Sequence, residues 1–263
     1  MGITAKIIAD SINPFGNRLT TLQLKYPRFI HAEFMTHRAF SRNSSSSRAV
    51  PVDRMMDQEI VFPVRWGKNQ KGMQPSQENL DDIDSVRANN HWIDALMACS
   101  TAARALSSLG VHKQWANRML EWFTPISVVV SATEWDNFFE LRDHPDAQDE
   151  IRILAQEIRK AMAASTPEEL EVGEWHLPYI TQGERRWVPL EDRKKISVAR
   201  CARVSYLKHD GTHSTREEDL ALFERLVGSN PKHLSPTEHQ ARASHLVRCA
   251  NFQGWRQYRK EIE

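Results

Sequence analysis

The chain has 263 residues, of which 40% are hydrophobic, and its 35 Lys and Arg residues almost balance its 34 Asp and Glu residues. This length can bury a sizeable core in one large domain or two small ones, and a formal charge of +1 excludes a global attraction to nucleic acid or anionic lipid. We expect a cytoplasmic protein, because neither a long apolar run nor a secretory signal is visible. The cysteines, Cys99, Cys201 and Cys249, form no Cys-x-x-Cys pair, which predicts reduced thiols rather than a disulfide framework or a zinc site.

The first predicted elements are two strands over residues 3–9 and 19–25, which are rich in branched apolar residues and separated by a turn of Asn, Pro and Gly. Pro27 suits the first turn of a short helix, and Ile30 and Phe34 lie about one turn apart on it. The pattern predicts a hairpin or two neighbouring strands, followed by a helix.

The middle of the chain is predicted to be mostly helical. Residues 64–80 are polar and rich in Gly, Gln and Asn, which indicates an exposed excursion. Apolar residues at helical spacing then predict a helix over 81–108 that ends near Gly110, and a second helix over 112–121. The short β-branched run at 126–130 is typical of a buried strand.

Two amphipathic helical segments follow, at 135–141 and 147–164. Residues 165–195 contain three prolines, two glycines and many charges, which predicts a linker that lies against the body through its aromatic residues. Order resumes at Ile196 as a strand or a helix, and a helix is predicted over 215–227.

Residues 37–48 place three arginines, one histidine and four consecutive serines within twelve positions. Arginine offers a planar fork of donors that matches phosphate, and small hydroxyl residues let a ligand approach the backbone closely. The segment therefore predicts an anion site, with a disordered serine-rich loop as the alternative. A second candidate segment is 131–152, where Asn137 and Arg142 lie about a turn and a half apart on a predicted helix and can serve one extended ligand.

These two segments resemble the flavin-dependent thymidylate synthases. The family's Arg-His-Arg motif, followed after seven residues by Ser, reads Thr-His-Arg at 36–38 and Ser46 here, with Arg48 at the position of the family's phosphate-binding arginine. The family's Asn-containing helix ending in Leu-Arg is matched at 137–142, and its Ala-Gln-x-Glu-Ile sequence at 147–151.

A third match lies in an unexpected place. The family's N-terminal blocks, Ala-Arg-Val-Ser-Tyr, an acidic helix and His-x-Ser-Pro-x-Glu-His, correspond here to 202–206, 217–220 and 233–239, near the C-terminus. This order predicts a circular permutation, with 165–195 as the joining segment, because chain termini commonly lie close together on the surface.

The resemblance implies one domain over 1–263, of α/β (α+β) class, with a central, mostly antiparallel sheet packed against a helical subdomain. Residues 1–164 would carry the main motifs, and 196–263 would be the permuted part.

The resemblance also implies transfer of a one-carbon unit from methylenetetrahydrofolate to C5 of dUMP, giving dTMP, with FAD as cofactor and NADPH as reductant. It further implies a homotetramer with sites shared between subunits. In such chemistry the cofactor carries the difficult step and the protein mainly positions the reactants. The other class of thymidylate synthase needs an activated cysteine, and no cysteine here has a Pro-Cys or Cys-His setting.

By the same resemblance, the FAD-binding residues would be His37, Arg38, Asn43, Asn137, Ser235 and Glu238, with His233 near the flavin and folate. Ser46, Arg48 and Arg142 would bind the nucleotide, and Ser46 and Arg142 would act in catalysis. No metal site is predicted, because the turn-forming Asp-Gly between His209 and His213 argues against a helix that could pair them.

The chain departs from the family pattern at six positions: Glu33 for glutamine, Thr36 for arginine, Ser44 for glutamate, Asn117 for arginine, Thr133 for arginine and Asp146 for histidine. Each lost charged hydrogen bond is worth about 1.5–3 kcal/mol, so weaker binding of FAD or nucleotide is expected. Arg42, Lys113 and Arg118 are the candidates to compensate.

Two alternatives stay open. The changed residues also fit an enzyme that methylates or hydroxymethylates another pyrimidine nucleotide, such as dCMP. A nucleic-acid-binding module would instead use Arg38, Arg42, Arg48 and the tail 255–260, where aromatic residues alternate with cations. The near-neutral charge argues against the module, so neither a nucleic-acid partner nor a membrane partner is expected.

Overall fold

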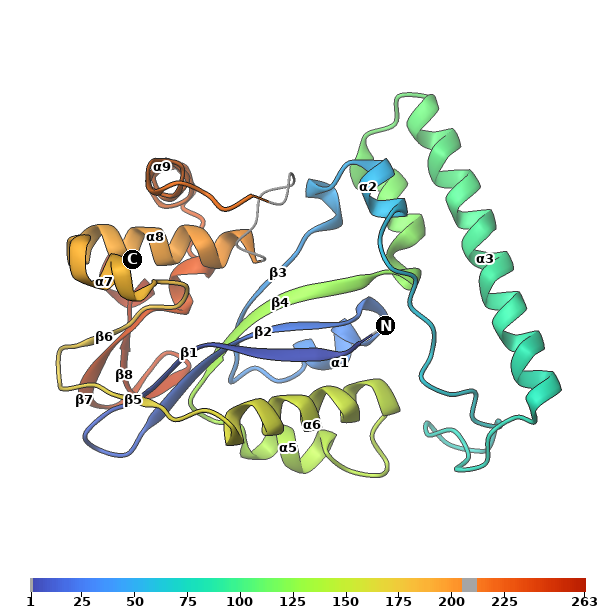
Figure 1. The fold of residues 1–263 in the computed structure, drawn as a ribbon, viewed down its shortest axis with the longest axis horizontal. Helices are drawn as coiled ribbons and strands as arrows, with labels where there is room; N and C mark the ends of the chain where they lie inside the picture. The colour runs from blue at the N-terminus through green and yellow to red at the C-terminus, as the bar shows by residue number, and fades with distance from the viewer. Residues whose placement is uncertain (1, 205–211) are drawn as a thin grey trace.

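The computed structural model describes residues 2–204 and 212–263. Its centre is a five-stranded sheet in the order β3-β4-β2-β1-β5, in which all neighbours are antiparallel except β1 and β5 (Figure 1). The strands are β1 (Thr4–Ile12), β2 (Arg18–Pro27), β3 (Ser41–Ser44), β4 (Pro125–Ala132) and β5 (Glu168–Glu169). The predicted mixed class with a mostly antiparallel sheet is confirmed.

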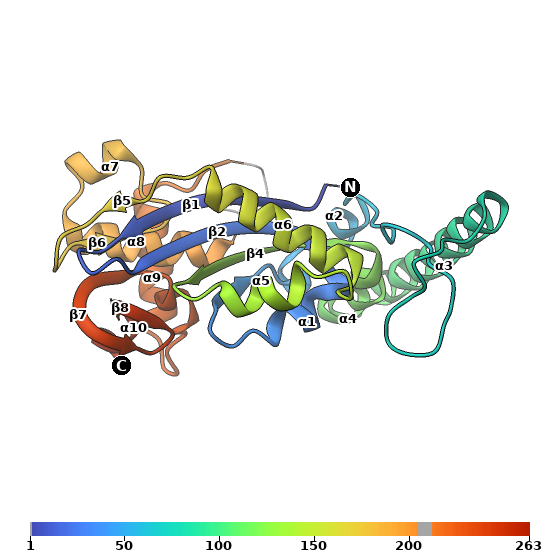
Figure 2. The ribbon, with the colours of Figure 1, turned by 90° about the horizontal axis from the view of Figure 1, so that it is seen from below.

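One face of this sheet is apolar and is covered by two helices. On β2 the side chains of Leu22, Leu24 and Tyr26 point to this face and are fully buried. They pack against α5 (Asp136–Arg142) and α6 (Asp149–Ala163), which run beneath the strands (Figure 2). The alternation along β2 and the apolar stripe of α6 together build the main core.

The opposite face is covered at one end by the C-terminal third of the chain. There α8 (Leu190–Arg203) packs Cys201 against Val129 of β4, and α9 (Arg216–Val227) packs on α8. A second sheet in the order β6-β7-β8 lies beside them, built from β6 (Trp175–His176), β7 (Ala241–Cys249) and β8 (Phe252–Gln257).

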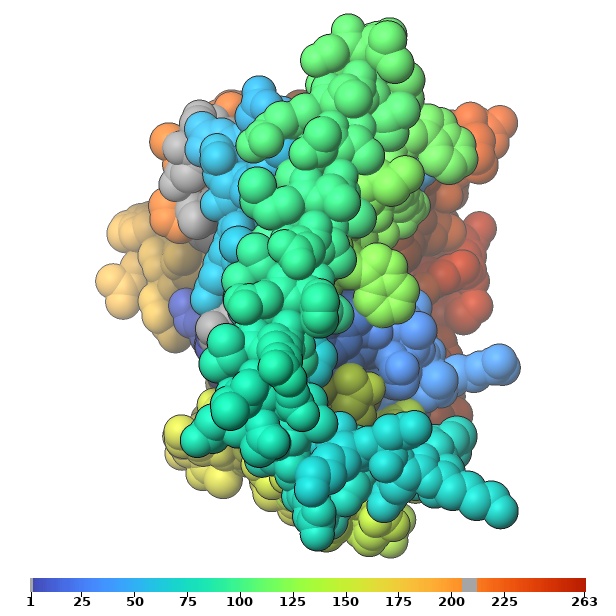
Figure 3. All heavy atoms as spheres, turned by 90° about the vertical axis from the view of Figure 1, so that its right-hand side faces the viewer, coloured from blue at the N-terminus to red at the C-terminus, as the bar shows by residue number. Residues whose placement is uncertain are grey.

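A helical subdomain stands at the other end of the sheet. It contains α2 (Val52–Met56), α4 (Lys113–Ala116) and the long α3 (Asp82–Ser108), which crosses a whole side of the molecule (Figure 3). The predicted helix over 112–121 is in fact α4 followed by a 3-10 helix. No helix among the described residues is both long and apolar enough to span a bilayer.

Short elements complete the chain: η1 (Arg28–Ile30), α1 (His31–Met35), η2 (Ser47–Ala49), η3 (Asn117–Phe123), α7 (Gln182–Trp187), η4 (Ser235–Glu238) and α10 (Arg259–Ile262). Residues 37–48 are therefore an ordered strand and helical turn, and the alternative of a disordered loop is wrong.

Residues 165–195 lie against the body, as predicted, but they carry more regular structure than a linker, and their role as a joining segment stays a prediction. The segment contains β5, β6, α7 and the start of α8, because β5 pairs with β1 and β6 pairs with β7. The stretch from Ile196, predicted as a strand or a helix, is helix up to Arg203. Ser205, Tyr206 and the turn predicted at 210–211 lie outside the described residues.

The hairpin of β7 and β8 was not predicted, because Gly254 and several charged residues obscure the alternation of apolar and polar residues along its strands. Gly254 has a φ of +73°, and a Cβ there would lie 2.5 Å from the Asn17 amide nitrogen and 2.6 Å from that of Asn13. Its carbonyl accepts a hydrogen bond of 2.7 Å from Asn13. Here the glycine lets the side-chain amides of Asn13 and Asn17 lie close against the backbone of β8.

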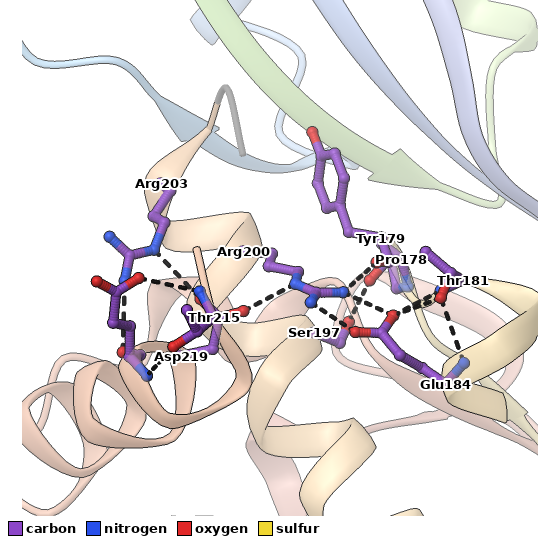
Figure 4. A network of polar contacts seen from close by, with 10 residues as sticks. Pro178, Tyr179, Thr181, Glu184, Ser197, Arg200, Arg203, Thr215 and Asp219 are labelled. Atoms are coloured by element: carbon purple, nitrogen blue, oxygen red, sulfur yellow. Dashed lines mark hydrogen bonds and ion pairs between the residues drawn. The ribbon is translucent and has the colours of Figure 1, made fainter. Parts of the chain in front are cut away.

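A buried arginine holds the C-terminal helices together (Figure 4). The Arg200 side chain is 3% exposed, and its Nε donates to Oδ2 of the fully buried Asp219 at 2.8 Å. The same guanidinium donates to Glu184 Oε1 at 2.6 Å and to the carbonyl of Tyr179 at 2.8 Å. Arg200 thereby connects α7, α8 and α9 to the segment before α7.

Replacing Arg200 should strongly destabilise the protein. Arg200→Ala leaves the Asp219 carboxylate buried without this partner, which should lower the free energy of unfolding by about 3–5 kcal/mol. Arg87→Ala is the control, because the Arg87–Asp84 pair is 70% and 50% exposed and its loss should cost below about 1 kcal/mol. Urea titration followed by circular dichroism measures both, and equal losses would contradict this account.

Candidate functional site

The structure joins the two segments singled out in the sequence through one hydrogen bond. Arg142, the last residue of α5, donates from Nε to Nε2 of His37 at 3.0 Å, and its Nη2 lies 3.4 Å from the hydroxyl of Thr36. His37 is 9% exposed and its ring packs against Phe40 and Phe138. An arginine at position 36 would place a second cation beside Arg142, whereas threonine offers a hydroxyl acceptor.

This environment keeps the His37 imidazole neutral. Burial, then the nearby charges of Arg142 and Arg42, lower the pKa of His37 from 6.5 to about 4. A neutral ring can accept a hydrogen bond at Nε2, as the contact with Arg142 requires. His37 therefore fixes the direction of the Arg142 guanidinium.

The three candidate compensating cations are bound within the chain. Arg42 donates from Nη1 to the carbonyls of Met35 and His37, both at 2.9 Å, where α1 ends. Lys113 donates to the carbonyl of Ala49 at 3.1 Å. Arg118 donates to both carboxylate oxygens of Glu121, each at 3.0 Å. The idea that these three replace the missing arginines at the ligand is not supported by their contacts.

Asn117 holds the serine segment in place. It is fully buried, and its Nδ2 donates to the carbonyls of Ser47 and Val50, both at 2.8 Å. The Ser47 hydroxyl donates to Glu121 at 2.5 Å. Ser46 and Arg48, on either side of this anchor, remain exposed. Asparagine at 117 thus supports the segment from inside rather than reaching a ligand.

Ser46 and Arg142 line different cavities. Ser46 lies on a cavity of about 330 Å³ with Lys25 and Arg28, whereas Arg142 lies on one of about 500 Å³ with Glu33 and Asp146. The predicted substrate residues therefore fall into two groups in the single chain.

The excursion after α2 forms part of the wall of the Arg142 cavity. Arg65 pairs with Asp149 of α6 at 2.5 Å, and the backbone N–H of Val64 donates to Glu150 at 2.8 Å. These contacts attach the excursion to α6.

Several predicted cofactor residues lie where β3 meets the C-terminal block, since η4 packs against β3. The Asn43 amide lies 3.1 Å from the carbonyl of Ser235, so its nitrogen is assigned to that side. Glu238 forms an ion pair with Arg259, so its carboxylate is already engaged. His233 is exposed, and its backbone N–H donates to Leu226 at 2.7 Å.

Arg38 and Asn137 are exposed. In the part of the chain that the structure describes, no hydrogen bond or ion pair engages the side chain of either. They are thus open to a ligand. The tail proposed for nucleic-acid stacking differs, since Trp255 is 0% and Tyr258 is 6% exposed; that use of the tail is wrong, because both rings belong to cores.

The sequence interpretation missed a buried chain of polar side chains that ends at Asn43. It consists of Ser11, His176, Thr21, Ser131, His239 and Asn43, joined by contacts of 2.9, 2.8, 2.6, 2.9 and 3.2 Å in that order. Burial lowers the pKa of both His176 and His239 to about 3, so both rings are neutral. His239 closes the His-x-Ser-Pro-x-Glu-His block and was the signal available to find this chain.

The central sheet, the His37–Arg142 contact and the serine segment make up a protein of mixed α/β fold with a polar candidate site. A family model described as thymidylate synthase complementing protein, Thy1, matches residues 13–168. This is more than half of the chain, and the chain belongs to this family of flavin-dependent thymidylate synthases. It is therefore an enzyme of the methylase type.

Solved structures support the fold. Two crystal structures of the UMP/dUMP methylase PolB from Streptomyces cacaoi, bound with 5-Br dUMP and 5-Br UMP, are similar to this chain. Their sequence identities to it are 18% and 19%, and their TM-scores are 0.50 and 0.51. Each match covers 62% of this chain, and the two matches cover 90% and 89% of the methylase chains. No curated protein matches. These likenesses concern the fold, and the circular permutation stays a prediction.

The buried neutral histidines predict acid sensitivity. The pKa of His37 and His31 is lowered to about 4, and that of His176 and His239 to about 3, from 6.5. Below pH 6.5 these histidines bind protons in the unfolded chain but stay neutral in the folded chain. The free energy of unfolding therefore falls as the pH falls, by up to about 1.4 kcal/mol per pH unit for each histidine. Urea unfolding at pH 7.5, 6 and 5 measures this slope.

The exposed His144 provides the control. His144→Asn should leave the slope unchanged, whereas His176→Asn should reduce it. A stability that does not change between pH 7.5 and 5 would show that these rings are not held neutral.

Proposed function

We propose that the protein transfers a one-carbon unit from methylenetetrahydrofolate to C5 of dUMP, with FAD as cofactor and NADPH as reductant. The observation that carries this proposal is the 3.0 Å hydrogen bond between Arg142 and His37, because it assembles the two family segments into one site. The family match supports flavin chemistry on a nucleotide, and dUMP as the substrate is part of our proposal.

The donor set fits FAD. Arg38 is exposed and can meet a pyrophosphate, while the amide of the half-buried Asn43 and the exposed Asn137 and Ser235 can meet ring edges and ribose. When bound, the flavin would supply the hydride chemistry. Glu238 would act indirectly, because Arg259 already holds its carboxylate.

The nucleotide would be positioned by arginines and a serine. The exposed Arg48 and Ser46 suit its phosphate. Arg142 lines the other cavity, and its guanidinium N–H groups beyond the one used by His37 can donate to the pyrimidine. These charged hydrogen bonds would orient the base toward the flavin.

A route without a nucleophilic cysteine agrees with the state of the thiols. Cys201 is fully buried, and burial raises the pKa of its thiol well above the ordinary value. Cys99 and Cys249 are half-buried and unpaired. The thiolate is the reactive form, so Cys201 is a poor nucleophile.

Glu33 favours dCMP as a second candidate substrate. It lines the same cavity as Arg142. No described residue forms a hydrogen bond or ion pair with its carboxylate, and Oε2 is buried. A carboxylate only accepts hydrogen bonds, and the exocyclic amino group of cytosine is a matching donor.

Product analysis separates the two substrates. Purified protein with FAD, NADPH and methylenetetrahydrofolate should convert dUMP to dTMP, as measured by mass spectrometry. Arg142→Ala should lower kcat/KM about 10- to 150-fold through loss of a charged hydrogen bond, while Arg225→Ala, on the exposed side of α9, should not.

Turnover of dCMP alone would reject our first choice. In that case Glu33→Gln should weaken dCMP relative to dUMP, because glutamine adds a donor where cytosine also donates.

We also propose a homotetramer in which each site takes residues from two subunits. Ser46 and Arg142 line separate cavities in one chain, which supports completion by another copy. On α3, Ile83, Val86 and Met97 are 66%, 58% and 59% exposed, an apolar face of the kind that subunits cover.

Subunit mixing tests the shared site. Ser46→Ala and Arg142→Ala should each lower the activity at least about tenfold. Co-expression of both should restore roughly a quarter of the activity if every site draws its two residues from different subunits. A monomeric mass in solution, or no recovery in the mixture, would contradict the shared site.

A further inference from the structure

The buried polar chain from Ser11 to Asn43 has one consistent direction. At its Asn43 end, the amide nitrogen lies 3.1 Å from the carbonyl oxygens of both Ser235 and Arg42 and 3.2 Å from Nε2 of His239. The opposite orientation would turn the amide oxygen toward two carbonyl oxygens, which cannot donate. The nitrogen therefore faces His239, and Nε2 of His239 is an acceptor.

This assignment determines the remaining donors. His239 must carry its proton on Nδ1 and donate to the hydroxyl of Ser131, 2.9 Å away. Ser131 then donates to Thr21 at 2.6 Å, and Thr21 donates to Nε2 of His176 at 2.8 Å. His176 carries its proton on Nδ1 and donates to Ser11 at 2.9 Å. The hydroxyls of Ser131 and Thr21 each accept one hydrogen bond and donate one, and Ser11 accepts the last.

We propose that His239 is a positioning residue that holds the Asn43 amide in this single orientation, so that its Oδ1 accepts a ring imide N–H from the bound ligand. All three neighbours of the amide are acceptors on the side of its nitrogen and share its two hydrogens, which leaves Oδ1 to accept from a ligand. Both a flavin and a uracil carry such an imide. The inference rests on the proposed function, since it takes this part of β3 as a flavin or nucleotide site.

The buried polar chain explains why the orientation of the Asn43 amide depends on distant residues. His239 and Thr21 are 0% exposed, and His176 is 1% exposed, so water cannot replace a lost partner. If Thr21 lost its hydroxyl, Ser131 would donate to Nδ1 of His239 instead. The His239 proton would move to Nε2 and meet the amide N–H of Asn43, which would displace the amide.

The test compares ligands with and without the imide proton. Isothermal titration calorimetry of the full-length protein would use FAD, N3-methyl-FAD, dUMP and N3-methyl-dUMP. The wild type should bind one parent ligand about three- to tenfold more tightly than its methylated form, as one hydrogen bond predicts. The pair that is discriminated identifies the ring that Asn43 contacts.

Three variants should lose this discrimination. Thr21→Val and His239→Gln should each bring the affinity ratio toward one, and Asn43→Ala should bring it to one. Since the methyl group also adds bulk, the ratio in each variant is compared with the wild-type ratio.

Thr20→Val is the matched control. Thr20 is equally buried and adjacent in β2, but it faces the other side of the sheet and donates to Asp10 at 3.1 Å. Its ratio should equal the wild-type ratio, and circular dichroism checks that all variants fold. Should Thr21→Val and His239→Gln both keep the wild-type ratio, or should the wild type not discriminate within either pair, the inference fails. If neither parent ligand binds, the proposed function fails with it.

Discussion

Thr21 and Ser131 lie side by side on adjacent strands, and both hydroxyls are fully buried. Burying a hydroxyl without a hydrogen bond costs several kcal/mol on apolar transfer scales, so the second face of the sheet must be covered by groups that bond to it. Those groups are the imidazoles of His176 and His239, which both come from the last third of the chain. The C-terminal part is thus bound to the sheet by polar complementarity as well as by the packing of Cys201 and Val204 on Val129.

The same docking builds the site. With His239 against β4, the Ser235 carbonyl reaches the amide of Asn43, and the C-terminal block becomes a wall beside β3. On the other side of β3, the hydrogen bond between Arg142 and His37 joins α5 to the segment that follows α1. A short edge strand therefore lies between two polar clusters, one neutral and the other containing a cation.

Neutral histidines distinguish this site from a simple anion-binding loop. Four histidines are held neutral by burial, and Arg42 is turned back onto the end of α1. Arg38 and Arg48 thus keep their charges exposed at the surface. Binding of an anionic ligand would depend on few cations, and the neutral rings would orient rather than attract it.

Periodicity and local chemistry in the sequence were enough to place the long helices at 82–108, 149–163 and 216–227 within two residues of their expected limits, because apolar spacing at 3.6 residues per turn is a local property. The motifs at 36–48 and 137–142 were likewise sufficient to indicate the family and its cofactor class. Tertiary structure alone decided that 165–195 is built into both sheets, that Arg42 and Asn117 serve the fold, and that His239 reaches Asn43. Strand pairing and hydrogen bonds between residues as far as 241 positions apart depend on which surfaces meet, and no local pattern encodes that.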